Sequence, residues 1–526
     1  MAGGLSRMPA SRWSPDVDRA AFVRRNRDLD PQLVWRGKDE QDWSDLVVPV
    51  PPIFPQESIS PGSLIAGLLK DGAGAAIGYY GHAGRGPNRM ILGDSLVVMA
   101  SLAEREGLRG QVQCVYVDPP YGIRFQSNFQ WSTTSRDVKD GDAGHITREP
   151  EQVRAFRDTW RDGIHSYLTY LRDRLVVARE LLADSGSVFF QIGEENAHLA
   201  RSLLDEVFGP QNFVADIVFR KKTMPLGARF LDCMVDHILW FAKDADQVKY
   251  RQLYWRQDVQ GDFHWKWFET PAGTFAMSRE QLRDHTRLPE GARIFRVVSM
   301  KAPGYSAAND FPIEVDGRSY RPPRGGSWIT GPDGMRRLCA AGRVFVEGRT
   351  PTYKLYLDDF PLAKLTSLWS DTVGAFGKRY VVETNEEIVK RCLLMATDPG
   401  DLVLDPTCGS GTTATVAEEW GRRWITMDTS RVALALARTR VMGARYPWYR
   451  LADGRDPAGG FNYARVPHVT LKAVANCSEI DEICTRHAAR AGGGDLGERL
   501  REIAEAIART ADAEWLHDKP EVESKR

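Results

Sequence analysis

The sequence predicts an α/β protein whose core is a doubly wound, mostly parallel sheet of seven strands. Apolar segments of strand length alternate along the chain with longer amphipathic segments. The almost continuous apolar run 112–117 is typical of a strand buried on both faces. The strand candidates end just before Asp94 and Asp118 and cover residues 188–192, 213–220, 237–242, 402–405 and 424–427. Residues 246–365 separate the last two strands from the others, so two distant chain segments must assemble one sheet.

The first part of the chain, residues 1–85, is rich in Pro, Asp, Arg and Gly and predicts an extended N-terminal arm. The mixture of Val and Pro in residues 47–55 is that of extended, linker-like chain. From residue 88 a short strand, a turn and a helix through about Leu102 follow. Asp94 stands just before that helix and suits an N-cap, because its carboxylate can accept backbone N–H groups of the first turn.

A long polar loop follows residue 121 and leads to a helix. The amphipathic pattern of this helix begins at about Glu151 and continues through Leu182. Ser185-Gly186-Ser187 predicts a turn before the strand 188–192. The remaining helices are expected at residues 196–208, 414–420 and 495–515.

The buried strand 112–117 leads directly into the motif Asp118, Pro119, Pro120, Tyr121. Chemistry in an open α/β sheet takes place just beyond the carboxyl ends of strands. A carboxylate and the Pro119 carbonyl can accept the two hydrogens of an exocyclic NH2 group, and a tyrosine ring can stack on a base. The same tetrapeptide also occurs as a plain turn, so the motif alone leaves both interpretations open.

A second motif joins strand 402–405 to a helix through a Gly-rich loop, which lets a backbone approach a nucleotide-like cofactor closely. The spacing is shorter than the dinucleotide pattern, and no Gly-Lys-Thr follows, which disfavours a triphosphate. Cys408 is expected to be a small packed residue rather than a nucleophile. Asp428 ends the next strand, where an acid can hold ribose hydroxyls. The candidate cofactor residues here are Asp405, Pro406, Thr407, Gly409, Ser410, Gly411, Thr412 and Asp428.

Residues 246–365 differ in composition and predict an inserted domain. Arginines and lysines alternate there with Trp and Tyr, a mixture that suits phosphate contacts and base stacking. A small domain with an aromatic core and solvated arginines is the alternative. Residues 86–245 and 366–450 would form the two segments of a catalytic domain, and residues 451–526 a helical C-terminal extension.

Composition limits the class of protein. The 526 residues suffice for two to four domains, and 42% hydrophobic and 27% charged residues are ordinary for a soluble protein. No run of 18 apolar residues and no signal-peptide core is seen, so no membrane partner is expected. The net charge of zero neither favours nor excludes nucleic acid. Seven unpatterned cysteines indicate a reducing, cytoplasmic setting and no metal site.

Together, the two motifs resemble those of the amino-group DNA methyltransferases. Residues 118–121 are similar to the catalytic motif of that family, and residues 405–413 to its S-adenosylmethionine loop, although many members carry Phe where Thr407 stands. The catalytic motif comes first, as in the beta class, and the chain looks most like modification subunits of type III restriction systems. By this resemblance Asp94 would lie beside the cofactor. Thr384 would belong to the segment closing over its methionine end, or would cap the following helix.

The resemblance implies a site-specific enzyme that transfers a methyl group from S-adenosylmethionine to the N6 amine of adenine in double-stranded DNA, with the target base flipped out. The insertion would recognise the target, within a restriction-modification or related phage-defence system. A homodimer, or a restriction or helicase subunit as partner, would fit such a system. Three alternatives stay open: a cytosine-N4 DNA methyltransferase, an RNA methyltransferase, and a DNA-binding modification subunit inactive without a partner.

Overall fold

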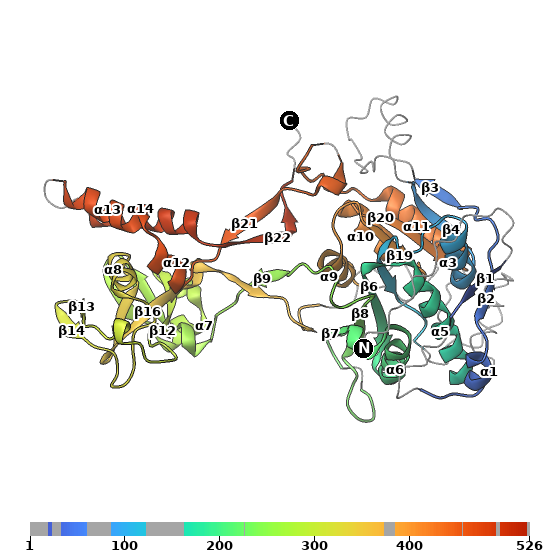
Figure 1. Cartoon of the computed structure of the whole chain (residues 1–526), viewed down its shortest axis with the longest axis horizontal. Helices are drawn as coiled ribbons and strands as arrows, with labels where there is room; N and C mark the ends of the chain where they lie inside the picture. Colours follow the sequence, from blue (N-terminus) through green and yellow to red (C-terminus); the bar gives the residue numbers. More distant parts are fainter. Residues whose placement is uncertain are drawn as a thin grey trace, which may run out of the picture. The chain divides into compact units, whose positions relative to one another are not determined.

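The computed structural model describes residues 19–23, 33–59, 86–121, 163–225, 227–372, 384–454, 456–490 and 495–522. The polar loop after Tyr121 and the first part of the predicted helix 151–182 lie outside these residues. Two compact units are visible in Figure 1. The first comprises the described residues of Met1–Leu253, Thr366–Asn462 and Pro520–Arg526, and the second those of Tyr254–Leu365 and Tyr463–Lys519.

A nine-stranded sheet forms the centre of the first unit, in the order β18-β7-β8-β6-β5-β19-β20-β4-β3. Its strands are β3 (Glu57–Ile59), β4 (Asn88–Leu92), β5 (Val112–Val117), β6 (Leu182–Gly193), β7 (Phe213–Arg220), β8 (Val235–Ala242), β18 (Leu368–Trp369), β19 (Leu402–Asp405) and β20 (Arg423–Asp428). Neighbours are parallel, except that β8 is antiparallel to β6 and β7, and β3 to β4. The predicted fold class is confirmed. The sheet has nine strands rather than seven, because the short strands β3 and β18 extend its two edges.

The helices of the first unit form two groups. One group is α3 (Ser95–Glu104), α5 (Ile164–Leu181) and α6 (Ala197–Phe208), and the other is α9 (Glu386–Ala396), α10 (Thr412–Glu419) and α11 (Arg431–Gly443). Members of each group pack on one another and against the sheet (Figure 1). The predicted turn at residues 185–187 is wrong, because β6 begins at Leu182, directly after α5. The pairing with β5 is irregular here, because Val112 lies opposite Leu182 and Cys114 opposite Ser187, which leaves extra residues in β6.

The centre of the sheet is the pair β5 and β19. They are parallel neighbours, with Val403 opposite Cys114 and Leu404 opposite Val115. From β5 the sheet continues outward through β6, and from β19 it continues through β20 in the other direction. This is the point where the strand order reverses, and ligands of doubly wound folds bind outside the carboxyl ends of the strands at such a point.

The described part of the N-terminal arm belongs to the first unit. Strand β1 (Arg19–Phe22) pairs with β2 (Leu46–Pro49), and α1 is the short helix Lys38–Asp42. Phe22, Trp35 and Val48 are buried in the same hydrophobic core as the sheet. The ammonium of Lys38 donates to Glu206 Oε2 of α6 at 2.6 Å, with both side chains buried. The arm is therefore packed structure rather than linker in these residues.

An antiparallel sheet in the order β11-β10-β12-β16-β15 forms the centre of the second unit. Its strands are β10 (Trp267–Thr270), β11 (Gly273–Ala276), β12 (Arg293–Ser299), β15 (Val344–Glu347) and β16 (Thr350–Tyr356). Three two-stranded sheets are formed by the strands β9 (Tyr254–Arg256), β13 (Ile313–Val315), β14 (Arg318–Tyr320), β17 (Leu362–Lys364), β21 (Tyr463–Pro467) and β22 (Ala513–Pro520). The helices are α7 (Arg279–Arg283), α8 (Pro332–Ala340), α12 (Leu471–Asn476), α13 (Glu479–Ala488) and α14 (Leu496–Thr510).

Residues 463–519 pack with the insertion, which the sequence did not indicate. Ile480 and Ile503 share a core with Trp328 and Tyr353. Helix α14 ends at Thr510 rather than near residue 515, because the chain then enters β22, which pairs with β21. Among the described helices, none is long and apolar enough to cross a membrane.

Candidate active site

Four neighbouring parallel strands, β5, β19, β20 and β4, each lead to an aspartate. These aspartates lie together, because the carboxyl ends of the four strands are on the same side of the sheet. Asp118 follows β5, Asp405 and Asp428 are the last residues of β19 and β20, and Asp94 lies two residues beyond β4. The four predicted acids therefore line one edge, although they come from three separate stretches of sequence. Such a row of carboxylates favours a ligand that carries positive charge or hydroxyl donors.

The two motifs are joined by a direct hydrogen bond. The backbone N–H of Asp118 donates to Thr407 Oγ1 at 2.9 Å, although 289 positions separate the two residues. Thr407 in turn donates its own N–H to Asp405 Oδ1 at 2.9 Å. The phenylalanine that is frequent at this position in the resembling family has no oxygen to accept the bond from Asp118. Thr407 is thus a contact between motifs as well as part of the loop.

A polar network surrounds the Asp118 carboxylate. Thr384 Oγ1 donates to Asp118 Oδ2 at 2.9 Å. The amide of Gln191 on β6 donates to Thr384 Oγ1 at 2.9 Å and to the Tyr121 hydroxyl at 2.6 Å. Gln191 in turn accepts a hydrogen bond of 2.6 Å from the Tyr116 hydroxyl. Gln191, which the sequence analysis did not single out, therefore orients both side chains next to the carboxylate.

Thr384 does not cap the helix that follows it. The cap of α9 is Asn385, whose side chain accepts the N–H of Glu387 at 2.9 Å. The hydroxyl of Thr384 is directed at Asp118 instead. Of the two interpretations of Thr384, the helix cap is therefore wrong, and the residue reaches the site through the catalytic motif.

Burial raises the pKa of Asp118 from its ordinary value of 3.8 to about 7. Hydrogen bonds from Thr384 and Tyr121 lower this pKa, whereas the charges of Asp405 and Asp236 raise it further. Burial likewise raises the pKa of Asp405 to about 6, against the lowering effect of the Thr407 N–H, and the charge of Asp428 adds to the rise. Neighbouring acids that resist ionisation in this way are typical of functional sites.

Three contacts fix the turn of the Pro-Pro motif. The Tyr167 hydroxyl of α5 donates to the Pro120 carbonyl at 2.7 Å, and the Asn196 amide donates to the Tyr121 carbonyl at 2.7 Å. Gly193 lies against the Tyr121 ring so closely that a Cβ at this glycine would be 2.9 Å from Tyr121 Cδ2. Tyr121 keeps one part exposed. The turn is thus held from β6 and from two helical segments.

The Gly-rich loop is folded around Asp428. The N–H groups of Gly409 and Ser430 donate to the two carboxylate oxygens of Asp428 at 3.0 and 2.8 Å. Gly411 has a φ of +76°, and a Cβ there would lie 2.7 Å from the Cβ of Ala437 on α11. This glycine is therefore required by backbone conformation and by the close approach of α11.

Ser410 and Thr412 direct their side chains to one arginine. The Arg440 guanidinium donates to the hydroxyl oxygens of Ser410 and Thr412, each at 2.8 Å, and to Glu386 at 2.6 Å. These two side chains are therefore oriented by Arg440, and their contact with a cofactor stays a prediction. Cys408 is buried, and burial raises the pKa of its thiol well above its usual range, which opposes a nucleophilic role.

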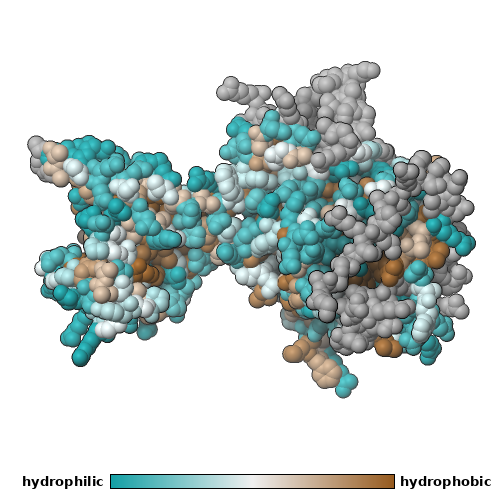
Figure 2. All heavy atoms as spheres, in the orientation of Figure 1, coloured by the Kyte–Doolittle hydropathy of each residue, from teal (hydrophilic) through white to brown (hydrophobic). Residues whose placement is uncertain are grey.

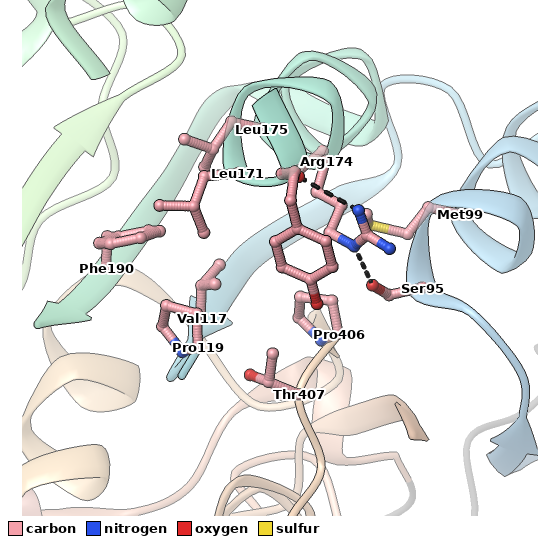
Figure 3. Close-up of a pocket in the computed structure, with 12 residues that line it drawn as sticks. Ser95, Met99, Val117, Pro119, Leu171, Arg174, Leu175, Phe190, Pro406 and Thr407 are labelled. Carbon is pink, nitrogen blue, oxygen red and sulfur yellow. Dashed lines mark hydrogen bonds between the residues drawn. The ribbon is translucent and has the colours of Figure 1, made fainter. Parts of the chain in front are cut away.

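A pocket lies between the two motifs (Figure 3). Pro119, Pro406 and Thr407 lie together along one side of it, facing Leu171 and Arg174. Beside the pocket, Arg174 donates to Ser95 Oγ at 3.0 Å and to both carboxylate oxygens of Asp94 at 2.8 and 2.7 Å. Asp94 also caps α3 by accepting the N–H of Leu96 at 2.8 Å. The two interpretations of Asp94 are compatible, because it caps the helix and lies at the site edge.

In the second unit several aromatic side chains are buried, whereas most of the arginines and lysines are exposed. Trp265 and Trp328 are buried, and the guanidinium of Arg343 is paired in the interior with Asp359. The exposed part of the mixture includes Arg321 and Arg324, which follow strand β14. Across the described part of both units, no group of three or more His, Cys, Asp or Glu side chains is placed to hold a metal ion.

The family model described as DNA methylase, for N6 and N4 methyltransferases, matches residues 112–439. The chain belongs to this DNA methylase family. The match covers both motifs and the insertion between them. It confirms the predicted class, an S-adenosylmethionine-dependent DNA methyltransferase, for which the acids and the Gly-rich loop provide a fitting set of ligand contacts.

Several relatives are similar to this DNA methylase. Type II methyltransferase M.EcaI of Enterobacter cloacae is 27% identical over 385 residues, which cover 71% of this chain and 72% of that protein. The probable type III restriction-modification enzyme HindVI Mod subunit of Haemophilus influenzae is 22% identical over 458 residues, with coverages of 76% and 57%. The StyLTI Mod subunit of Salmonella typhimurium is 22% identical, with coverages of 66% and 53%. The methylase thus spans just over half the length of these two Mod subunits.

Proposed function

We propose that this DNA methylase transfers a methyl group from S-adenosylmethionine to the N6 amine of an adenine at a specific site in double-stranded DNA. The observation that carries the proposal is the hydrogen bond from Asp118 to Thr407, which joins the amine-binding motif to the cofactor loop. Similarity to a type II methyltransferase and to type III Mod subunits supports a role in restriction-modification or a related phage defence in the cytoplasm.

The proposed role of Asp118 is to accept one hydrogen of the target amine. The lone pair of such an amine is delocalised into the ring, so the nitrogen is a poor nucleophile. Acceptance of its two hydrogens, by Asp118 and the Pro119 carbonyl, localises the lone pair and stabilises the positive charge that develops. A carboxylate offers about four acceptor positions, so Asp118 can keep the bond from Thr384 and still bind the amine. This role requires the ionised form of Asp118.

Tyr121 is proposed to stack on the flipped base. Its hydroxyl is held by Gln191 and its carbonyl by Asn196, so the ring is presented in one orientation. Preorganisation of this kind places the amine without a loss of ring entropy at the moment of reaction. A base must leave the duplex to reach the ring, because Asp118, Pro120 and Tyr121 are only partly exposed.

S-adenosylmethionine, when bound, supplies an electrophilic methyl group on a sulfonium. The residues proposed to hold it are Asp94, Asp405, Pro406, Thr407, Asp428, Thr384 and the backbone of Gly409, Ser410, Gly411 and Thr412. The acids suit the cationic and hydroxyl groups of this cofactor. Both oxygens of Asp428 accept backbone N–H groups, which fixes the carboxylate next to the Gly-rich loop where it is proposed to meet the ribose hydroxyls.

The second unit, with residues 254–365 as its main part, is proposed to recognise the target sequence. Its exposed arginines after β14 supply the charge that phosphate contact needs. A restriction subunit is the partner that the Mod relatives support, and a second copy of the chain is the alternative. Size measurement of the purified chain, with and without DNA, separates a homodimer from a monomer.

The test is sequencing of modified bases in DNA from a bacterial host that lacks other methyltransferases and expresses this chain. We expect N6-methyladenine at one short motif, and none in cells that express Asp118→Ala. Asp246→Asn, a change at an exposed carboxylate of the first unit, is the matched control and should leave the pattern intact. N4-methylcytosine would overturn the choice of base. Unmodified DNA together with methyl transfer to RNA would overturn the DNA substrate.

A further inference from the structure

The loop between β7 and β8 exposes three large apolar side chains. Met224, Phe230 and Leu231 are 69%, 82% and 95% exposed. Figure 1 shows this connection as a long loop extending from the sheet, and in Figure 2 brown spheres gather on the same projection. Water-exposed apolar groups concentrated on one loop mark a surface that is covered in a complex.

The loop leaves the sheet at the carboxyl ends of the parallel strands, where the active site also lies. Strand β8 runs antiparallel to both β6 and β7, with Asp236 opposite Gly193 on one side and opposite Phe219 on the other. The loop base therefore lies level with the carboxyl end of β6, close to the level of Asp118, which follows β5. With a spacing of about 4.8 Å between strands, the loop base lies about 10–15 Å from Asp118. Base pairs rise by about 3.4 Å each, so this is a distance of a few base steps.

Internal hydrogen bonds brace the loop. The Asp232 carboxylate accepts the N–H groups of Gly227 and Ala228, each at 3.0 Å. At its base the Arg220 guanidinium donates to the carbonyls of Lys222 and Thr223 at 2.8 and 2.9 Å. These hydrogen bonds fix the conformation of the loop that carries the apolar side chains.

The positive charge of the loop favours nucleic acid as the partner that covers it. Arg220, Lys222 and Arg229 flank the apolar side chains, and Asp232 is the single acid of the segment 220–234. Lys221 is paired with Asp236 of β8 at 2.6 Å. Arg229 lies 5.1 Å from the centre of the Phe230 ring, so a cation and an aromatic face are presented together. Base stacking and phosphate contact are the interactions for which this pairing is suited.

We propose that this loop is a wedge that enters the base stack of DNA beside the flipped target. Phe230 and Leu231 would fill space in the stack, and Lys222 and Arg229 would contact the flanking phosphates. Apolar side chains that part a base step lower the free energy needed to expose a base. The inference rests on the proposed function, since it concerns how the duplex delivers its base to Asp118.

The test compares two synthetic duplexes that carry the mapped motif. In one the target base is paired, and in the other it faces an abasic position, so that little energy is needed to expose it. For Phe230→Ala/Leu231→Ala we expect methyl transfer to fall by about tenfold or more on the paired duplex, because each loss of 1.4 kcal/mol corresponds to a factor of ten. On the abasic duplex we expect a loss below about threefold. Phe230→Trp, which keeps a stacking ring, should stay close to the unaltered chain.

Phe54→Ala is the matched control. Phe54 is 83% exposed and precedes β3, at the opposite side of the sheet from β7, and its loss should affect neither duplex. Equal losses of the double variant on both duplexes would overturn the wedge, and so would full activity on the paired duplex. Absence of transfer by the unaltered chain to both duplexes would instead overturn the proposed function and, with it, the wedge.

Discussion

Replacement of Asp118 by Asn should abolish methyl transfer and at the same time stabilise the protein. The charged form of Asp118 is unfavourable in the folded chain, since burial raises its pKa to about 7. Asparagine keeps the size of the side chain and the acceptor for Thr384, but it carries no charge. It also loses the carboxylate that we assign to the target amine. Activity and stability should therefore change in opposite directions.

The size of the stabilisation follows from the pKa. A rise from 3.8 to about 7 is about three pKa units, and at 1.36 kcal/mol per unit this sets an upper limit of about 4 kcal/mol. The side chain is only partly buried, and solvent screening reduces the effect, so we expect about 1–2 kcal/mol. The pKa of Asp118 is higher in the folded chain than in the unfolded one. The destabilisation by its charged form is therefore absent below pH 3.8, grows as the pH rises, and is constant above about pH 7.

The assay is urea unfolding followed by tryptophan fluorescence between pH 5 and pH 8.5. The difference in midpoint between Asp118→Asn and the unaltered chain should widen as the pH rises to about 7 and then stay constant. Asp246→Asn should show no such difference. A variant that is less stable at pH 8, or a difference that does not depend on pH, would refute the assignment of an unfavourable buried charge to Asp118.

Three further predictions follow from the site and the second unit. Methyl transfer per enzyme should rise with pH through a midpoint near 7, where Asp118 ionises. Thr384→Val should move that midpoint upward whereas Thr384→Ser should not, and an unchanged midpoint in the valine variant would contradict the role of Thr384. Gly411→Ala should cost at least about 1–2 kcal/mol of stability, measured by thermal melting, because of the positive φ and the contact with Ala437. Charge removal at Arg321 and Arg324 should lower the salt slope of DNA binding by about 2 and leave calorimetric affinity for S-adenosylmethionine intact, and a constant slope would exclude phosphate contact by these arginines.

The features that the sequence predicted correctly are local ones. Apolar runs located the seven main strands, because a strand buried on both faces has few polar residues. The position of an acid at the end of such a run located Asp118, Asp405 and Asp428. The site residues that the sequence did not predict depend on which strands are neighbours in the fold. Gln191 has the pattern of an ordinary strand residue, and its role is visible only because β6 lies beside β5. The hydrogen bond between Asp118 and Thr407 could not be predicted from the sequence around either residue.

In the N-terminal arm, the prolines concealed an alternating pattern that predicts a half-buried strand. Prolines at positions 49, 51 and 52 suggested linker-like chain. Leu46, Val48 and Val50 nevertheless alternate with exposed residues and are buried, which is the period of a strand with one face on a core. The packing of residues 463–519 with the insertion lacked a comparable signal, because helical amphipathicity shows that a face is buried but not against which partner.

The pairing of β5 with β19 also determines the order in which this protein can be completed during synthesis. The early strands can assemble only into two separate half-sheets, β7-β8-β6-β5 and β4-β3, and β19 and β20 are the strands that join them. The 289 positions between Asp118 and Thr407 take about 15–60 s to translate. From the completion of β8 at Ala242 until β19 is made, both half-sheets present open strand edges, the condition in which nascent chains aggregate or recruit chaperones. The methylase therefore emerges from the ribosome without a catalytic centre and acquires one only when its last two central strands close the gap.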